Sequence, residues 1–193
     1  MPPAVRKLAL TIHLATSVGW VGAVVGYLAL GIFAVRNPDS ESVRAAWTAM
    51  EVTGWWAIVP LAVAALLSGL IMSLGTPWGL FRHYWVLISL ALTVFCTAIL
   101  LLHMPTVSAT AAMLRDMEMP PGPGGAGGMG HGGMGGDLFH PGVGLLLLLA
   151  VMVLNIYKPR GLTRYGWRKQ QEERARRSER GPELQSLRPV PEP

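Results

Sequence analysis

Apolar residues fill four long stretches of the chain that contain no Asp, Glu, Lys or Arg. These runs are Leu8–Val35, Val52–Phe81, Tyr84–Ala112 and Leu138–Tyr157. Each reaches the roughly 20 residues that a helix needs to cross about 30 Å of hydrocarbon. The pattern predicts an all-α polytopic membrane protein, a bundle of four transmembrane helices at approximately 8–35, 52–75, 84–104 and 139–157.

Composition agrees with this prediction. Of the 193 residues, 51% are hydrophobic and only 14% are charged, a balance typical of membrane proteins and not of soluble domains. The first run follows Arg6 and Lys7 as in a secretory signal, but it is much longer than the roughly 7–15 apolar residues of a signal peptide. We therefore interpret it as a membrane anchor.

Basic residues predict the orientation of the bundle. The amino end, the short connection after the second helix and the tail together hold 13 Lys and Arg, whereas the other two connections hold three. Because basic residues accumulate on the cytoplasmic side, we expect both termini in the cytoplasm. The protein is then a multi-pass protein of a bacterial plasma (inner) membrane, and its transmembrane domain spans residues 1–160.

Two segments are too polar or too rich in glycine to cross the membrane. Residues 105–137 end in "PPGPGGAGGMGHGGMGG", which predicts a flexible outer loop. Residues 161–193 form a basic tail that we expect to be disordered in the cytoplasm, where its cations can contact anionic lipid headgroups. No recognisable nucleic-acid-binding fold surrounds these basic residues, so no nucleic acid is expected as a partner.

Glycine and proline mark special positions in the helices. Gly22 and Gly26 have the small-xxx-small spacing that lets two helix backbones approach closely in lipid. This face can serve a partner membrane protein or a second copy of the chain. Pro60 predicts a kink in the second helix. Pro141 predicts the first residue of the fourth helix, with His140 as the capping residue.

Polar residues follow single faces of the predicted helices. At 100° per residue, the third helix places Cys96 and His103 on one stripe, and the fourth helix places His140 on its own inward stripe. The third helix ends on the outer side and the fourth begins there. We therefore expect His103 and His140 at the same outer level, facing each other, whereas His13 lies near the inner level.

Paired imidazoles on facing helices can hold haem iron, and with thioethers they can hold Cu(I). The hypothesis names haem b or copper as the ligand. Its candidate haem-binding residues are His103, His140 and His13, and its candidate metal-binding residues are His103, His140, Met104, His131, Met129 and Met134. An end-of-helix histidine more often caps or contacts headgroups, and we interpret the Gly-Met-His loop as a spacer.

Two stretches resemble a known family. The sequence "LTIHLATSVGWVGAVVGYLAL", with His13, Trp20 and Gly22, resembles the first helix of the four-helix modules related to copper-resistance protein D (CopD). The stretch "LGTPWGLFRHYWVLISLALTVFCTAILLLHMP" and the later "YKPRGLTRYG" are similar to that group and to related uncharacterised bacterial membrane proteins. The resemblance covers residues 8–164 and implies a four-helix bundle that handles copper or binds haem.

The chain lacks the residue patterns of most enzymes. We find no nucleophile–base pair, phosphate loop or zinc helix, and no charged residue inside a predicted span that would drive ion-coupled transport. The sequence predicts a non-enzymatic integral membrane protein that binds haem or copper near its outer end. The alternative is a structural or assembly partner of another membrane protein, with no bound cofactor.

Overall fold

We describe the protein from a computed structural model. It describes residues 2–75, 80–116, 131–159 and 161–186, and the side chains of residues 131–137 and 179–186 are outside this description. The helices are α1 (Pro3–Arg36), α2 (Ser40–Thr53), α3 (Val59–Gly75), α4 (Tyr84–Asp116), α5 (His131–Tyr157) and α6 (Arg164–Ser186), with a π-helical turn η1 (Gly54–Ile58) between α2 and α3. The described residues form no strand.

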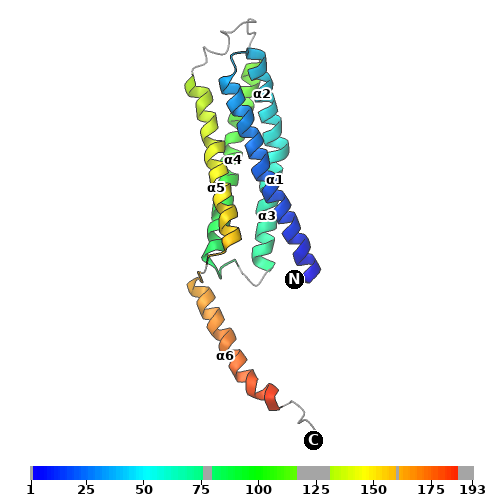
Figure 1. Ribbon diagram of the computed structural model, residues 1–193, viewed down its shortest axis with the longest axis vertical. Coiled ribbons are helices and arrows are strands. Elements are labelled where there is room, and N and C mark those ends of the chain that lie inside the picture. The colour runs from blue at the N-terminus through cyan, green and yellow to red at the C-terminus, as the bar shows by residue number, and fades with distance from the viewer. Residues whose placement is uncertain (1, 76–79, 117–130, 160, 187–193) are drawn as a thin grey trace.

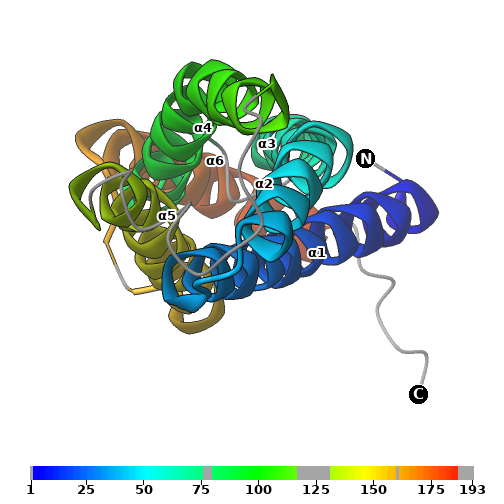
Figure 2. The same ribbon diagram turned by 90° about the horizontal axis from the view of Figure 1, so that it is seen from above.

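The helices build one elongated bundle from which α6 departs. Viewed along its length, α1, α3, α4 and α5 surround a common axis, and α2 continues the line of α3 (Figure 2). We call the end that carries α2 the α2 end, and the end that carries α6 and the amino terminus the α6 end (Figure 1). Within the described residues, four helical segments are long and apolar enough to span a membrane, namely Pro3–Arg36, Ser40–Gly75, Tyr84–Asp116 and Leu138–Tyr157. The prediction of an all-α protein with four such helices is confirmed.

The second apolar helix is longer than predicted, because residues 40–53 are helical and not a connection. Asp39 caps α2, and its carboxylate accepts a hydrogen bond from the Ser42 amide at 2.9 Å. Hydrogen bonds from Ser42 hold the pKa of Asp39 below its ordinary value. Residues 43, 46, 47 and 50 are buried, the spacing of an amphipathic helix face. Hydropathy alone missed this helix because its other face is polar.

The turn η1 lies directly before Pro60, where a kink was predicted. The Val59 amide donates to the Gly54 carbonyl, five residues back. Such a widened turn accommodates a disturbance in the regular hydrogen-bond ladder. A side chain at Gly54 would overlap the thioether of Met104, so the glycine makes room for this fully buried methionine.

Helix α4 also extends further than predicted. Pro105 and the residues up to Asp116 belong to the helix, which corrects the predicted loop of residues 105–137. The largest fully buried side chains among the described residues are Met50, Met104, Leu114, Val43 and Val107. These five side chains, from α2 and the second half of α4, form a core that we call the α2-end core. Burial of this face explains why α4 continues past Pro105.

Helix α5 begins at His131, earlier than the predicted start at residue 139. Pro141 therefore lies inside the helix and His140 does not cap it, contrary to the prediction. A proline inside a helix removes one backbone hydrogen bond, and the preceding turns of α5 continue despite this loss.

Residues 161–193 were predicted to be disordered, but residues 164–186 of this basic segment are helical. Residues 161–163 pair with the connection between α3 and α4: His83 and Leu162 form an antiparallel bridge. The Tyr84 amide donates to the Gly161 carbonyl at 3.2 Å, and the Thr163 amide donates to the Arg82 carbonyl at 3.0 Å. The Thr163 hydroxyl caps α6 by accepting from the Gly166 amide at 3.0 Å.

Two glycines of this junction differ in the space around them. A β-carbon at Gly166 would overlap the backbone carbonyl of Arg82, whereas one at Gly161 would meet only a Tyr84 ring carbon at an ordinary 3.8 Å. The backbone carbonyl cannot move without breaking its hydrogen bond to Thr163. Gly166 is therefore required by the junction, and Gly161 is not.

We expect Gly166→Ala to weaken the junction by about 1–3 kcal/mol, because an added methyl overpacks a site bounded by backbone. Limited proteolysis of the purified protein should then cut between α5 and α6 faster than in the wild type. Gly161→Ala is the matched control and should behave as the wild type. Equal cleavage rates for the two variants would contradict the prediction.

Candidate functional site

His103 of α4 and His140 of α5 lie together, although 37 positions separate them in the chain. Their ring centroids are 4.7 Å apart and the ring planes are inclined by 23°, so the two imidazoles are stacked. The ring of Phe139 meets His140 edge-on, with centroids 6.0 Å apart. His103 is half-buried and His140 is exposed.

The two rings line a cavity of about 220 Å³ between α1, α4 and α5. Its walls are almost wholly apolar or aromatic, with Trp20 and Val24 from α1 and Phe95 from α4. The side chains that carry polar or sulfur atoms are Trp20, Tyr27, Cys96, His103, Met104 and His140. Two imidazoles, a thioether and a thiol therefore share one apolar space.

Helical spacing explains why these groups face the cavity. Cys96 and His103 are seven residues apart, two turns on one face of α4. The hydroxyls on the same stretch are satisfied within the helix: Thr93 donates to the Ser89 carbonyl and Thr97 to the Thr93 carbonyl, each at 2.8 Å. These two hydroxyls are thus hydrogen-bonded within α4.

His13 lies elsewhere and does not line this cavity. Its Nδ1 atom is 3.0 Å from the Ser68 hydroxyl and 3.2 Å from the Ala65 carbonyl oxygen. The ring packs on Gly69, where an added β-carbon would come within 3.0 Å of the imidazole. The structure places this histidine in the contact between α1 and α3, apart from His103 and His140.

The other candidate metal ligands are the three methionines and His131. Met104 lines the cavity but also fills the space above Gly54. Met129 lies outside the described residues, and the side chains of His131 and Met134 are not described. Along α5, His131 and Met134 precede His140 by nine and six residues, about 13 and 9 Å at 1.5 Å per residue. This separation disfavours them as ligands shared with His140.

Haem does not fit between the stacked rings. Two imidazoles on opposite sides of a haem iron, with metal–nitrogen bonds of about 2 Å, have ring centres about 6 Å apart and both planes pass through the metal. The observed centroid distance is 4.7 Å with nearly parallel planes, which leaves no space for a macrocycle. The 220 Å³ cavity is also below the roughly 300 Å³ at the small end of ligand pockets.

A single metal ion fits the spacing better. Two imidazoles bound side by side to one ion, at about 90–110°, have ring centres about 4.5–5 Å apart, close to the 4.7 Å observed. The nitrogens do not converge while the rings are stacked, so one ring must turn about its Cβ–Cγ bond. That torsion is broad for histidine, and His140 is exposed, so its ring has room to turn.

Within the described part of the chain, no group of three or more His, Cys, Asp or Glu side chains is placed to hold a metal ion. Any metal at His103 and His140 would therefore take its remaining ligands from sulfur atoms, water or segments not described. Imidazole with thioether is a donor set that suits Cu(I) better than hard cations.

Comparison with protein-family models, with curated proteins and with solved structures gives no match to this chain.

The folded junction between α6 and the connection after α3 was not predicted from the sequence. A signal was present: Thr163 precedes a polar helical stretch, and threonine is a favoured capping residue. The role of Gly54 was not predicted either, since the space there is taken by Met104 from a distant part of the chain.

Proposed function

We propose that the protein is a multi-pass protein of a bacterial plasma membrane, with both termini in the cytoplasm and the α2 end outside. The distribution of Lys and Arg supports this orientation, with 13 on the cytoplasmic side and three outside. Large apolar side chains on the outer faces of the bundle, among them Leu102, Leu146 and Ile156, are more than 60% exposed. Lipid is the surrounding that would cover them.

The positions of aromatic residues support two membrane boundaries. Tyr84 and Tyr157 are exposed near the α6 end, and Trp56, 82% exposed, lies about 20 residues before the end of α3. Interfacial Trp and Tyr rings favour the headgroup level. Counting about 20 residues from the inner boundary places His103 and His140 at the outer boundary, and the α2-end core then lies beyond the lipid.

We infer further that the protein binds copper as Cu(I) at His103 and His140. The observation that carries this inference is the pair of imidazoles 4.7 Å apart at an apolar cavity that also contains a thioether and a thiol. The resemblance of the sequence to modules related to copper-resistance protein D supports the same ligand. Haem b was the other ligand considered, and the stacked geometry disfavours it. The proposed role is binding and not catalysis.

A second candidate function is assembly with another membrane protein or with a second copy of the chain. Gly22 and Gly26 are exposed, and a β-carbon at either position would meet no atom within 4 Å. Their small-xxx-small face is therefore not used for packing inside the bundle, in contrast to Gly19, where an added β-carbon would come within 3.3 Å of the Leu61 side chain. An outward glycine face in lipid permits close approach of a partner helix.

The orientation predicts that a fluorescent protein fused after Pro193, of a kind that folds only in the cytoplasm, becomes fluorescent in bacterial cells. The same reporter fused after Asn37, at the end of α1, should stay dark because that position faces outward. Fluorescence in the opposite pattern would invert the bundle and exclude the proposed topology.

The copper site predicts one Cu(I) per chain in the purified protein, measured by anaerobic titration against a colorimetric Cu(I) chelator. Removal of a group that is hydrogen-bonded to a metal ligand weakens metal binding roughly 10- to 100-fold. His103→Ala and His140→Ala each remove a ligand itself, so each should weaken Cu(I) binding by more than this. His83→Ala, directly before α4 at the α6 end, is the control and should bind as the wild type.

Two results would count against the copper site. The first is a copper content at background for the wild type. The second is a Soret band in wild-type protein that was expressed with haem supplied, together with loss of this band in His103→Ala or His140→Ala. That result would show that the histidine pair holds haem and not copper.

The assembly candidate predicts that Gly22→Leu with Gly26→Leu dissociates a co-purifying partner or a dimer in mild detergent, observed by light scattering. Copper binding and thermal stability should be unchanged, since the added side chains meet open space. Gly19→Leu is the contrasting variant and should lower thermal stability through its contact with Leu61. If the double variant keeps the mass of the wild-type complex, the glycine face is not the contact.

A further inference from the structure

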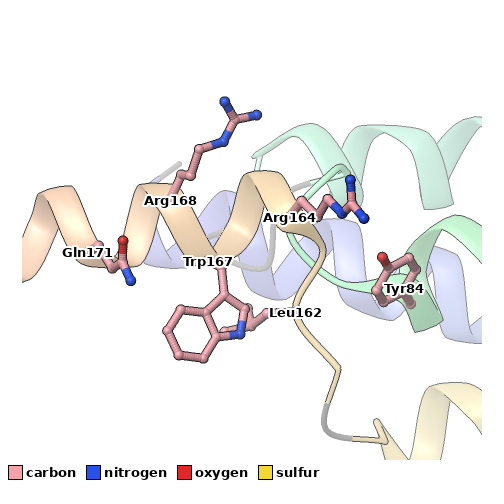
Figure 3. Close-up of a pocket in the computed structure, with 6 residues that line it drawn as sticks. All are labelled: Tyr84, Leu162, Arg164, Trp167, Arg168 and Gln171. Carbon is pink, nitrogen blue, oxygen red and sulfur yellow. The ribbon is translucent and has the colours of Figure 1, made fainter.

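A groove of about 580 Å³ lies at the α6 end, between the start of α4 and the first turns of α6. The residues that line it are Tyr84, Leu162, Arg164, Trp167, Arg168 and Gln171. Trp167 lies beside Leu162, and Arg164 extends from α6 on the side of Tyr84 (Figure 3). The groove thus combines two guanidinium groups with two aromatic rings.

The walls of this groove are held in a fixed relation. The Tyr84 amide donates to the Gly161 carbonyl, and the Thr163 amide donates to the Arg82 carbonyl. The Thr163 hydroxyl donates to the Phe81 carbonyl, and Arg82 forms an ion pair with Glu173 of α6 at 3.1 Å. The start of α6 is therefore attached to the start of α4 by both backbone and side chains. A ligand in the groove meets a preformed site.

Among the described side chains, none neutralises the positive charge of Arg164 and Arg168 in the groove. No described acidic side chain lies within ion-pair distance of Arg164 or Arg168, whereas nearby Arg82 and Lys169 pair with Glu173 and Glu172. Residues 164–168 carry two arginines and no acidic residue, and acidic residues begin at Glu172. Arg164 and Arg168 thus precede the acidic residues of α6, and the later basic residues, from Arg174 on, follow Glu172 and Glu173.

The depth of these turns matches a lipid headgroup layer. A bilayer of about 40–45 Å with a hydrocarbon core of about 30 Å has about 5–8 Å of headgroups on each side. Arg164 and Arg168 are four residues apart, about 6 Å along the helix, and α6 starts where the bundle ends (Figure 1). Tyr84 and Trp167 are both about half-exposed, as interfacial rings are.

We propose that this groove binds the phosphate of an anionic phospholipid of the cytoplasmic leaflet, with Arg164 and Arg168 as the phosphate contacts. Guanidinium groups bind phosphate oxygens in pairs of hydrogen bonds, and the rings of Tyr84 and Trp167 face the adjacent glycerol and acyl region. The proposal rests on the membrane orientation proposed above and is independent of the copper site.

The test uses full-length protein in a neutral detergent, with retained lipid counted by native mass spectrometry. Phosphatidylglycerol and phosphatidylcholine are added as the two probes. We expect one phosphatidylglycerol per chain and weaker retention of phosphatidylcholine. At about 1 kcal/mol per basic group, Arg164→Gln with Arg168→Gln should reduce phosphatidylglycerol affinity roughly 25-fold.

Arg176→Gln with Arg177→Gln is the matched control, since it removes the same charge from α6 further from the bundle. Its affinity for phosphatidylglycerol should equal that of the wild type. An equal loss in both double variants would show diffuse attraction and overturn the site. Equal retention of the two lipids would overturn it as well.

Two further outcomes are separable. Inorganic phosphate that displaces phosphatidylglycerol at similar concentration would assign the groove to a soluble phosphate compound and overturn the lipid proposal. Lipid binding measured in detergent does not depend on the orientation of the protein in the membrane. If the reporter fused after Pro193 stays dark while lipid binding is normal, the proposed topology is wrong. The groove would then be an anionic-lipid site of the outer leaflet and not of the cytoplasmic leaflet.

Discussion

The contact between α2 and the second half of α4 determines the arrangement of the rest of the bundle. Met50 of α2 and Met104 of α4 are fully buried in it, and the flanking Val107 and Leu114 extend it toward the end of α4. Lipid tails are as apolar as these side chains, so burial drives helix association only where water is the alternative. In the proposed orientation, this core lies outside the lipid, where the hydrophobic effect acts in full. It fixes the rotation of α4 and thereby the direction of His103.

The opposite end is fixed by different interactions. There the backbone of residues 161–163 pairs with that of residues 82–84, and an ion pair joins Arg82 to Glu173. Hydrogen bonds and charge replace apolar burial because these segments are polar. The bundle is therefore held at both ends, and the part between them contains the cavity beside His103.

The two candidate sites follow from these two ends. The imidazole pair lies next to the α2-end core. Met104 belongs to this core, and the adjacent His103 lines the cavity. The arginine groove lies between the two walls of the α6 junction. In each case a packed or paired region holds the backbone, and the neighbouring side chains remain available for a ligand. The stacking of His103 on His140 at 4.7 Å leaves no space for a macrocycle between the two rings.

The sequence by itself determined the four apolar helices and the common level of His103 and His140. These features depend on local properties, namely the absence of charge over about 20 residues and the 3.6-residue period. It did not determine where the helices end. Two amphipathic segments, residues 40–53 and 105–116, resemble polar connections in the sequence. Only the structure shows that each buries one face against the other. The widened turn at Gly54, the need for glycine at Gly166 and the stacking of the imidazoles were decided by tertiary structure alone, because each depends on an atom from a distant part of the chain.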